Sequence, residues 1–130
     1  MAACPIVAVP LSWNRAADTL ACLRSLQAAG LPLAQAVVVD NGSTDDSVAV
    51  VQAACPEVHL LVNARNLGFA GGVNPGLARA LEMGQPYILL LNNDTEVAAD
   101  SLERLVAAAE EHPRAGILSP LILYAGDGRV

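Results

Sequence analysis

Four short, largely apolar segments constrain the fold most strongly, because each of them stops abruptly at a polar cluster. The segments are residues 6–9, 36–39, 59–62 and 87–91. Each is too short for a typical helix and lacks polar alternation, which is the pattern of a strand buried on both faces of a parallel sheet. Stretches with apolar residues at helical spacing separate them. This order predicts one domain over residues 1–130, with an α/β fold, three α/β/α layers and a mainly parallel, doubly wound sheet.

Local patterns place the helices and two further strands. The helices are expected over residues 17–29, from a capping-box pair at Ser43 and Asp46 to Pro56, over residues 75–83, and from a similar pair at Asp100 and Glu103. Residues 66–74, which precede the third of these helices, are expected to form a loop. Short strands are expected at residues 117–118 and 121–124.

The composition excludes several classes of α/β protein. The net charge of −6 argues against binding to nucleic acid. All seven basic residues are arginines, and a P-loop requires lysine. Residues 10–18 contain no glycine, so the first strand is not followed by the dinucleotide-binding fingerprint. The sequence also lacks the Gly-x-Ser-x-Gly pattern of a nucleophile elbow.

Cysteine usage and hydropathy indicate the cellular setting. Cys4, Cys22 and Cys55 are widely spaced, and together with His59 and His112 they lack the spacing of zinc ligands. Free thiols in a reducing compartment explain them more simply. The amino terminus has no charged leader with an apolar core, and no apolar run approaches the roughly 20 residues of a membrane span. We therefore expect a cytoplasmic protein without a transmembrane segment.

Polar residues follow each of the first four predicted strands. Trp13 follows the first strand, Asp40 the second, residues 66–74 the third and Asp94 the fourth. The carboxyl ends of parallel strands share one edge of the sheet, where open α/β sheets bind their ligands. The connections at the opposite edge are short and chemically plain. We therefore expect these residues to converge on one crevice, although they are far apart in the sequence.

The residue types in this crevice suit a nucleotide diphosphate. Asp40 could accept hydrogen bonds from the imide of a base or from ribose hydroxyls, and Trp13 could offer a stacking face. Asn92 and Asp94 could supply oxygens to a hard divalent cation that bridges a diphosphate. The alternative interpretation is that Asn-Asn-Asp-Thr at residues 92–95 only turns the chain and caps the next helix.

Three motifs in register resemble glycosyltransferase family 2. They are Val-Val-Val-Asp-Asn-Gly-Ser-Thr-Asp at residues 37–45, Asn-Leu-Gly-Phe-Ala-Gly-Gly at residues 66–72 and Leu-Leu-Leu-Asn-Asn-Asp-Thr at residues 89–95. The resemblance covers almost the whole chain. Within the family, the motifs resemble most specifically the rhamnosyltransferase-like branch, which has the GT-A fold. None of these motifs is specific by itself, but the occurrence of all three in the family's order is a specific signal.

The resemblance implies roles for individual residues. It implies that a nucleotide-sugar is bound by Trp13, Asp40, Asn66, Gly72, Asn74 and Asn93. It also implies that Asp94, with Asn92, holds Mg²⁺ or Mn²⁺ against the diphosphate. Asn92 replaces the first carboxylate of the family's Asp-x-Asp motif, and Val73 and Pro75 interrupt the family's usual pattern in the preceding loop.

The same resemblance implies an inverting glycosyltransferase of polysaccharide biosynthesis. Such an enzyme transfers a sugar from a dTDP- or UDP-linked donor to a saccharide or lipid-linked acceptor, and this chain would supply the donor-binding half. Family members continue for about as long again, and the catalytic base belongs to that part. We therefore assign no catalytic residue here and expect the 130-residue chain alone to be inactive. The alternatives are a non-catalytic nucleotide-binding module and a truncated, inactive remnant.

Two further expectations follow from the same comparison. A lipid-linked acceptor would place the protein peripherally at the inner face of the membrane. A GT-A sheet truncated after residue 130 would lack its last strands, which leaves an unpaired edge and apolar surface near residues 117–124. We expect self-association, as a homodimer, through that edge.

Overall fold

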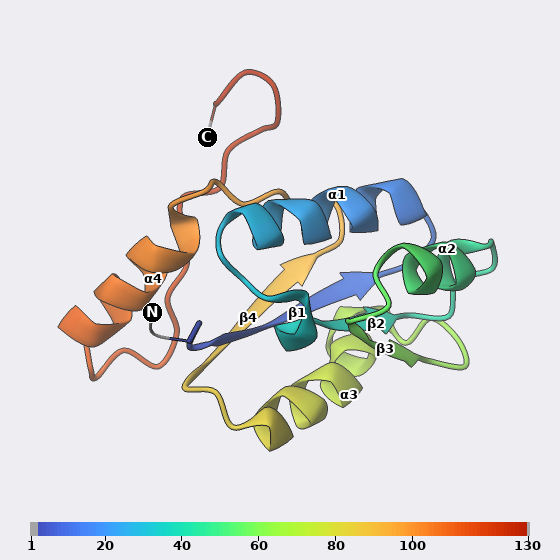
Figure 1. Ribbon diagram of the computed structural model, residues 1–130, viewed down its shortest axis with the longest axis horizontal. Helices are drawn as coiled ribbons and strands as arrows, with labels where there is room; N and C mark the ends of the chain where they lie inside the picture. Colours follow the sequence, from blue (N-terminus) through green and yellow to red (C-terminus); the bar gives the residue numbers. More distant parts are fainter. Residues whose placement is uncertain (1–2, 130) are drawn as a thin grey trace.

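The computed structural model describes residues 3–129, which fold into one α/β unit (Figure 1). In chain order its elements are β1 (Ile6–Ser12), α1 (Ala16–Ala28), the 3₁₀ turn η1 (Leu33–Gln35), β2 (Val37–Asp40), α2 (Ser47–Ala54), β3 (His59–Val62), α3 (Gly68–Met83), β4 (Tyr87–Asn92) and α4 (Ser101–Glu111). Within this described part of the chain, no helix is long and apolar enough to cross a membrane.

The sheet is parallel throughout, with the strand order β3-β2-β1-β4. The chain steps outward from β1 to β3 and then crosses back to place β4 on the other side of β1. Helices α1 and α2 therefore cover one face of the sheet, and α3 covers the other (Figure 1). This arrangement confirms the predicted three-layer, doubly wound sheet. The reversal of strand order lies between β1 and β4, where such sheets bind ligands.

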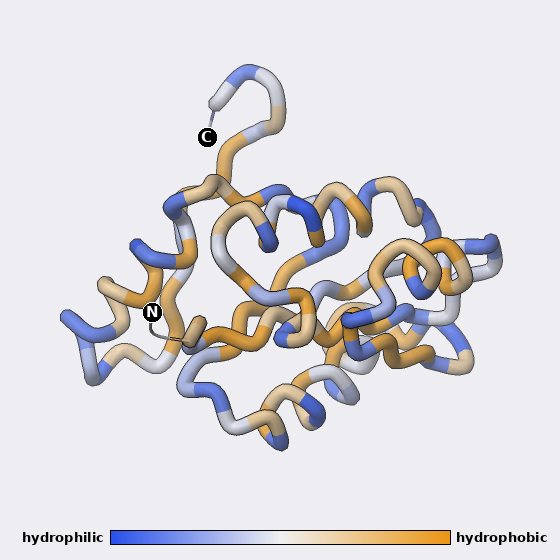
Figure 2. Tube along the Cα trace, in the orientation of Figure 1, coloured by the Kyte–Doolittle hydropathy of each residue, from blue (hydrophilic) through white to orange (hydrophobic). Residues whose placement is uncertain are grey.

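Alternate residues of each strand enter two separate cores. Ile6 and Ala8 of β1 pack beneath α1 and α2, whereas Val7 and Val9 pack beneath α3. All four side chains are fully or almost fully buried. The strands are correspondingly among the most hydrophobic stretches of the trace (Figure 2). Burial on both faces is the physical reason that these segments show no polar alternation.

Glycine at position 76 brings α3 close to the sheet. A Cβ atom at Gly76 would lie 2.5 Å from side-chain atoms of both Val9 and Val39. The absence of a side chain there lets the helix approach the strands more closely than any other residue would allow.

Strand β1 continues beyond its predicted end. The sequence predicted a strand over residues 6–9, but the structure extends it through Pro10 to Ser12. Its ladder to β4 is continuous, while its ladder to β2 is interrupted between the Ala8–Ala36 bridge and the Leu11–Val39 pair. Proline has no N–H to donate, which accounts for the interrupted ladder to β2. Strand β1 continues through Pro10 because its ladder to β4 remains intact.

The third predicted helix begins earlier than expected. Residues 66–74 were expected to form a loop and the helix to start near Pro75, but α3 starts at Gly68 and contains Pro75. Gly68 adopts a φ of 73° at this start. The glycine-rich first turns have low helix propensity, and their packing against the sheet and the loop after β2 outweighs it.

Four other sequence expectations were wrong. Residues 117–118 and 121–124 form no strand; the chain after α4 ends in a loop that projects away from the sheet (Figure 1). No neighbouring strand pairs with these residues in the described structure, and short apolar runs need such a partner. The capping boxes are absent, because α2 starts at Ser47, beyond Ser43, and the Asp100 side chain pairs with Arg104 instead of capping α4.

Candidate functional site

A cleft of about 450 Å³ opens at the carboxyl edge of the sheet, where the ends of β1 and β4 meet the loops after β2 and β3. Its lining consists of Leu11, Trp13, Arg15, Asn41, Asn66, Gly68, Phe69, Asn92 and Asn93. The volume is that of a small-molecule site, and the position is the switch point of the doubly wound sheet.

Two aromatic side chains give the cleft flat apolar surfaces. Trp13 follows β1 and Phe69 lies in the first turn of α3, and each is 50 % exposed. Exposed aromatic rings beside neutral amides suit the stacking of a planar or ring-shaped ligand. Arg15 adds a positive charge to this lining.

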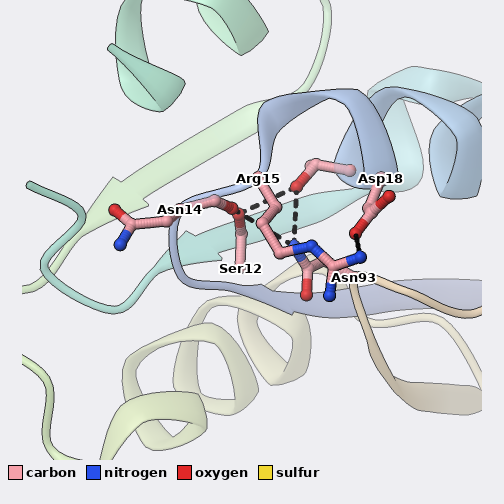
Figure 3. Close-up of polar contacts among 6 residues, drawn as sticks. Ser12, Asn14, Arg15, Asp18 and Asn93 are labelled. Carbon is pink, nitrogen blue, oxygen red and sulfur yellow. Dashed lines mark hydrogen bonds and ion pairs between the residues drawn. The ribbon is translucent and has the colours of Figure 1, made fainter. Parts of the chain in front are cut away.

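The segment after β1 is held in a left-handed conformation by a hydrogen-bonded cluster (Figure 3). Asn14 and Arg15 have φ angles of 55° and 56°, which are uncommon for residues other than glycine. The amide nitrogen of Asn93 donates to the carbonyl of Asn14 at 3.4 Å and to the hydroxyl of Thr19 at 3.2 Å. The Thr19 hydroxyl also pairs with that of Ser12 at 2.8 Å. The end of β4 thus fixes the loop that carries Trp13.

The loop after β2 braces the same segment from the other side. The backbone N–H of Asn14 donates to the Ser43 hydroxyl at 2.7 Å, and the Thr44 N–H donates to the Asn14 side-chain oxygen at 2.9 Å. Ser43 in turn donates its N–H to Asp40 at 2.8 Å and its hydroxyl to the other oxygen of that carboxylate. Asp40 is only 2 % exposed. Part of its hydrogen-bonding capacity therefore orders its own loop.

Arg15 forms an ion pair with Asp18 at the start of α1 (Figure 3), with 2.7 Å between the nitrogen and the oxygen. The contact is an ion pair by distance, without the alignment of a hydrogen bond. The arginine side chain is 70 % exposed, so the pair adds little to stability. The pair restrains the side chain of Arg15, which lines the cleft.

Asn41 is a buried centre of the loop cluster, at 3 % exposure. Its amide nitrogen donates to the Asn66 side-chain oxygen and to the Gly68 carbonyl, both at 3.1 Å. Its amide oxygen accepts from the Asn63 side chain and from the Leu67 N–H, both also at 3.1 Å. These four bonds use the full capacity of a side-chain amide.

Two glycines allow the loop after β2 to pack closely against the loop after β3 and against α3. A Cβ atom at Gly42 would lie 2.5 Å from the backbone of Arg65, and Gly42 has a φ of 78°. A Cβ atom at Gly72 would lie 2.7 Å from the Asn41 amide. The loop after β2 is thus in direct contact with the loop after β3 at Gly42 and with α3 at Gly72, and a larger residue at either point would separate them.

The segment after β4 has a different character. Asn92 and Asp94 are exposed, and among the described residues their side chains form no hydrogen bond or ion pair. Burial raises the pKa of the Cys22 thiol to about 12, and the negative charges of Asp94 and Glu96 add to this effect. Within residues 3–129, no three His, Cys, Asp or Glu side chains are grouped as a metal site.

The structure brings half of the sequence-predicted site residues together. Trp13, Asn66, Asn92 and Asn93 line the cleft, whereas the remaining four, Asp40, Gly72, Asn74 and Asp94, lie outside its lining. Asp40 and Gly72 are buried next to it, and Asn74 and Asp94 are exposed to solvent.

Sequence reasoning missed three informative residues of the lining. Asn41 and Phe69 lay inside the quoted motifs, and an amide or aromatic side chain in a glycine-rich segment is the signal that could have identified them. Arg15 had no such signal, because its place in the cleft depends on the left-handed backbone.

Comparison with known proteins gives a consistent assignment. Residues 7–129 match the family described as glycosyl transferase family 2. The N-acetylglucosaminyl-diphospho-decaprenol L-rhamnosyltransferases of two Mycobacterium tuberculosis strains, CDC 1551 and H37Rv, are each 34 % identical over 126 residues. These alignments cover 91 % of this chain and 40 % of each relative. The chain thus spans about two fifths of the length of the relatives it matches.

Solved structures show the same fold. The crystal structure of S. aureus TarS residues 1–349 in complex with UDP superposes with a TM-score of 0.63 at 21 % identity, over 91 % of this chain and 39 % of that one. A second S. aureus TarS structure gives a TM-score of 0.59 at 20 % identity, over 92 % and 24 % of the two chains. The likeness confirms the predicted GT-A type of architecture.

The family match over nearly the whole chain, together with the identity to the two mycobacterial enzymes, shows that this chain belongs to glycosyl transferase family 2 and resembles its rhamnosyltransferases.

Proposed function

We propose that this chain forms the nucleotide-sugar-binding part of a glycosyltransferase. The observation that carries the proposal is the cleft at the switch point of the sheet, lined by aromatic rings, amides and one arginine. The donor would be a dTDP- or UDP-linked sugar. The UDP named for the TarS structure and the L-rhamnose named for the mycobacterial relatives support this class of donor.

The cleft lining suggests how such a donor would lie. The base or sugar ring would stack on Trp13, and Asn66 would approach the ribose and phosphates. Asp40, at the end of β2, would accept a hydrogen bond from the base with the capacity that Ser43 leaves free. Gly72 and Asn74 would contribute from α3. Asn93 would act mainly by holding the Trp13 loop, because its amide nitrogen already bonds to Asn14 and Thr19.

The residues at the end of β4 fit a divalent cation by their chemistry. Asn92 and Asp94 offer hard oxygen donors that are exposed and unpaired within the described structure, and Mg²⁺ and Mn²⁺ prefer such ligands. Two protein ligands leave most positions to the donor diphosphate and water. A bound cation would stabilise the negative charge of the leaving diphosphate. Arg15 adds positive charge to the same cleft.

The complete reaction involves more than the residues described. We propose transfer to a saccharide or lipid-linked acceptor, on the model of the acceptor in the name of the mycobacterial enzymes. We assign no catalytic base within residues 3–129, because Asp94 is proposed as a metal ligand and the family resemblance implies that the base belongs to the acceptor-binding part. A decaprenol-type acceptor is a membrane lipid, so we propose a cytoplasmic protein that acts peripherally at the membrane.

Calorimetric titration tests the proposed function. UDP and dTDP are titrated into the chain with and without MnCl₂, and saturable binding that strengthens with Mn²⁺ is expected. Absence of binding for both nucleotides at millimolar concentration would overturn the proposal. Sugar transfer by the 130-residue chain alone would contradict the placement of the base outside it.

We further propose that two copies associate through the outer edge of β4. This edge is unpaired in the sheet, Leu90 on β4 is 41 % exposed, and the side chains of Ile117, Leu121 and Ile122 are at least 71 % exposed. An open strand edge and exposed apolar side chains each favour pairing with another chain. A single monomeric species by light scattering at high protein concentration would rule this out.

A further inference from the structure

Asn41 fixes the orientation of a second side-chain amide in the cleft wall. The Leu67 backbone N–H can only donate, so the atom of Asn41 that faces it must be the amide oxygen. The amide nitrogen of Asn41 then faces the Asn66 side chain and the Gly68 carbonyl. The Leu67 backbone N–H therefore determines which end of the Asn41 side-chain amide is the oxygen and which is the nitrogen.

The same reasoning determines the orientation of Asn66. Its side-chain oxygen accepts from the Gly68 backbone N–H at 2.9 Å and from the amide nitrogen of Asn41 at 3.1 Å. Both donors require the oxygen on that side. The amide nitrogen of Asn66 therefore points away from these partners, and Asn66 lines the cleft. Within the described residues that nitrogen has no hydrogen-bond partner.

We propose that Asn41 is a positioning residue, which holds Asn66 so that its amide N–H groups face the cleft and donate to an oxygen of the bound nucleotide. This inference rests on the proposed function for the nature of the ligand. It adds that the Asn66 contact is a donor contact, and that its direction is set by a buried residue outside the predicted site.

The test uses two variants that separate the roles of these residues. Asn66→Asp keeps an oxygen for the Gly68 N–H and the Asn41 amide but removes the donor, so the chain should fold normally and lose nucleotide affinity. Asn41→Ala removes the positioning bonds and leaves Asn66 chemically intact. For both, we expect affinity for UDP or dTDP to fall roughly tenfold or more, as for loss of a supporting partner at a binding site.

Gln35→Ala is the matched control. The Gln35 side chain donates two hydrogen bonds to backbone carbonyls, of Cys4 and Ile6, at the opposite edge of the sheet. The Gln35→Ala substitution should lower the melting temperature without changing nucleotide affinity. Affinity is measured from the emission of Trp13, the single tryptophan, at a temperature where circular dichroism shows every variant folded.

Amide hydrogen exchange supplies a readout that needs no ligand. In Asn41→Ala, exchange at Leu67 and Gly68 should accelerate while β1 and β4 stay protected; unchanged exchange would overturn the positioning role. Unchanged affinity in Asn66→Asp or Asn41→Ala, with a wild type that binds, would overturn the inference alone. A wild type that binds neither nucleotide would overturn the proposed function, and exchange would still decide whether Asn41 holds this wall.

Discussion

The loops after β2 and β3 and the segment of Asn92 to Asp94 at the end of β4 lie at the same edge of the sheet but use their polar groups differently. In the first region, Asp40 bonds to its own loop through Ser43, and Asn41 and Asn63 bond to each other and to residues 66–72. In the second, Asn92 and Asp94 remain exposed and unpaired within the described structure. The difference indicates that one wall is built before a ligand arrives, whereas the other offers oxygens that a ligand or cation would complete.

The largest expected effect comes from separating the loops after β2 and β3, which form the prebuilt wall of the cleft. Gly42→Ala places a Cβ atom 2.5 Å from the Arg65 backbone at a φ of 78°, so it adds a steric clash to left-handed strain. We expect a loss of about 2–4 kcal/mol in the free energy of unfolding, measured with urea. The matched control is Gly84→Ala, at a φ of 74° with nothing within 4 Å of the new Cβ. It should cost only about 1 kcal/mol; equal losses would show that the two loops can separate freely.

The next effect concerns the open wall. Asp94→Asn should leave stability within about 0.5 kcal/mol of wild type, because the carboxylate is exposed and unpaired. It should lower the Mn²⁺-dependent part of nucleotide affinity about tenfold, as measured by calorimetry. Glu96→Gln changes a neighbouring exposed acid and should not alter affinity. Equal affinity of Asp94→Asn and wild type in MnCl₂ would remove Asp94 from the proposed cation site.

A third prediction uses Cys22 as a probe beside the open wall. The pKa of this thiol is raised from 9.0 to about 12 in the folded protein, so the unfolded chain loses the proton first as pH rises. The raised pKa of Cys22 therefore adds fully to the free energy of unfolding below pH 9. This stabilisation is lost as the pH rises toward 12, with a slope of up to about 1.4 kcal/mol per pH unit. Urea unfolding between pH 8 and about pH 10 measures it, and Cys22→Ala should reduce the slope.

The same thiol reports on the segment after β4. Asp94 and Glu96 help to raise the pKa of Cys22, so Asp94→Asn should lower it. Absorbance titration of the thiolate in a Cys4→Ala/Cys55→Ala background measures the shift. An unchanged titration would place the Asp94 charge farther from α1 than the structure indicates.

The smallest expected effect concerns the outer edge of β4. Leu90→Lys should shift the association equilibrium toward monomer at high concentration, because a charge on an edge strand disfavours pairing. Leu81→Lys changes a leucine of α3 that is 71 % exposed and should have little effect. Light scattering and sedimentation would compare them, and identical association of both variants would exclude this edge.

Sequence patterns predicted the fold more completely than the site. Apolar runs without alternation predicted doubly buried strands, and the cores around Ile6 and Val7 confirm them. The same rule failed at residues 117–124, because a strand also needs a neighbour. The start of α3 was misplaced because glycines at 68, 71 and 72 look like a loop when packing is unknown. Trp13, Asn66, Asn92 and Asn93 were predicted for the site and do line the cleft.

The parallel sheet, the edge that carries the polar residues and the family could all be inferred from the amino-acid sequence. Periodicity and motif order are local properties that can be read along the chain. The directions of several polar side chains at the site depend instead on contacts between segments that folding brings together. The left-handed backbone at Asn14 and Arg15 and the fixed amides of Asn41 and Asn66 depend on partners far apart in the sequence. Hydrogen bonds between loops require their relative positions, which only the folded sheet provides.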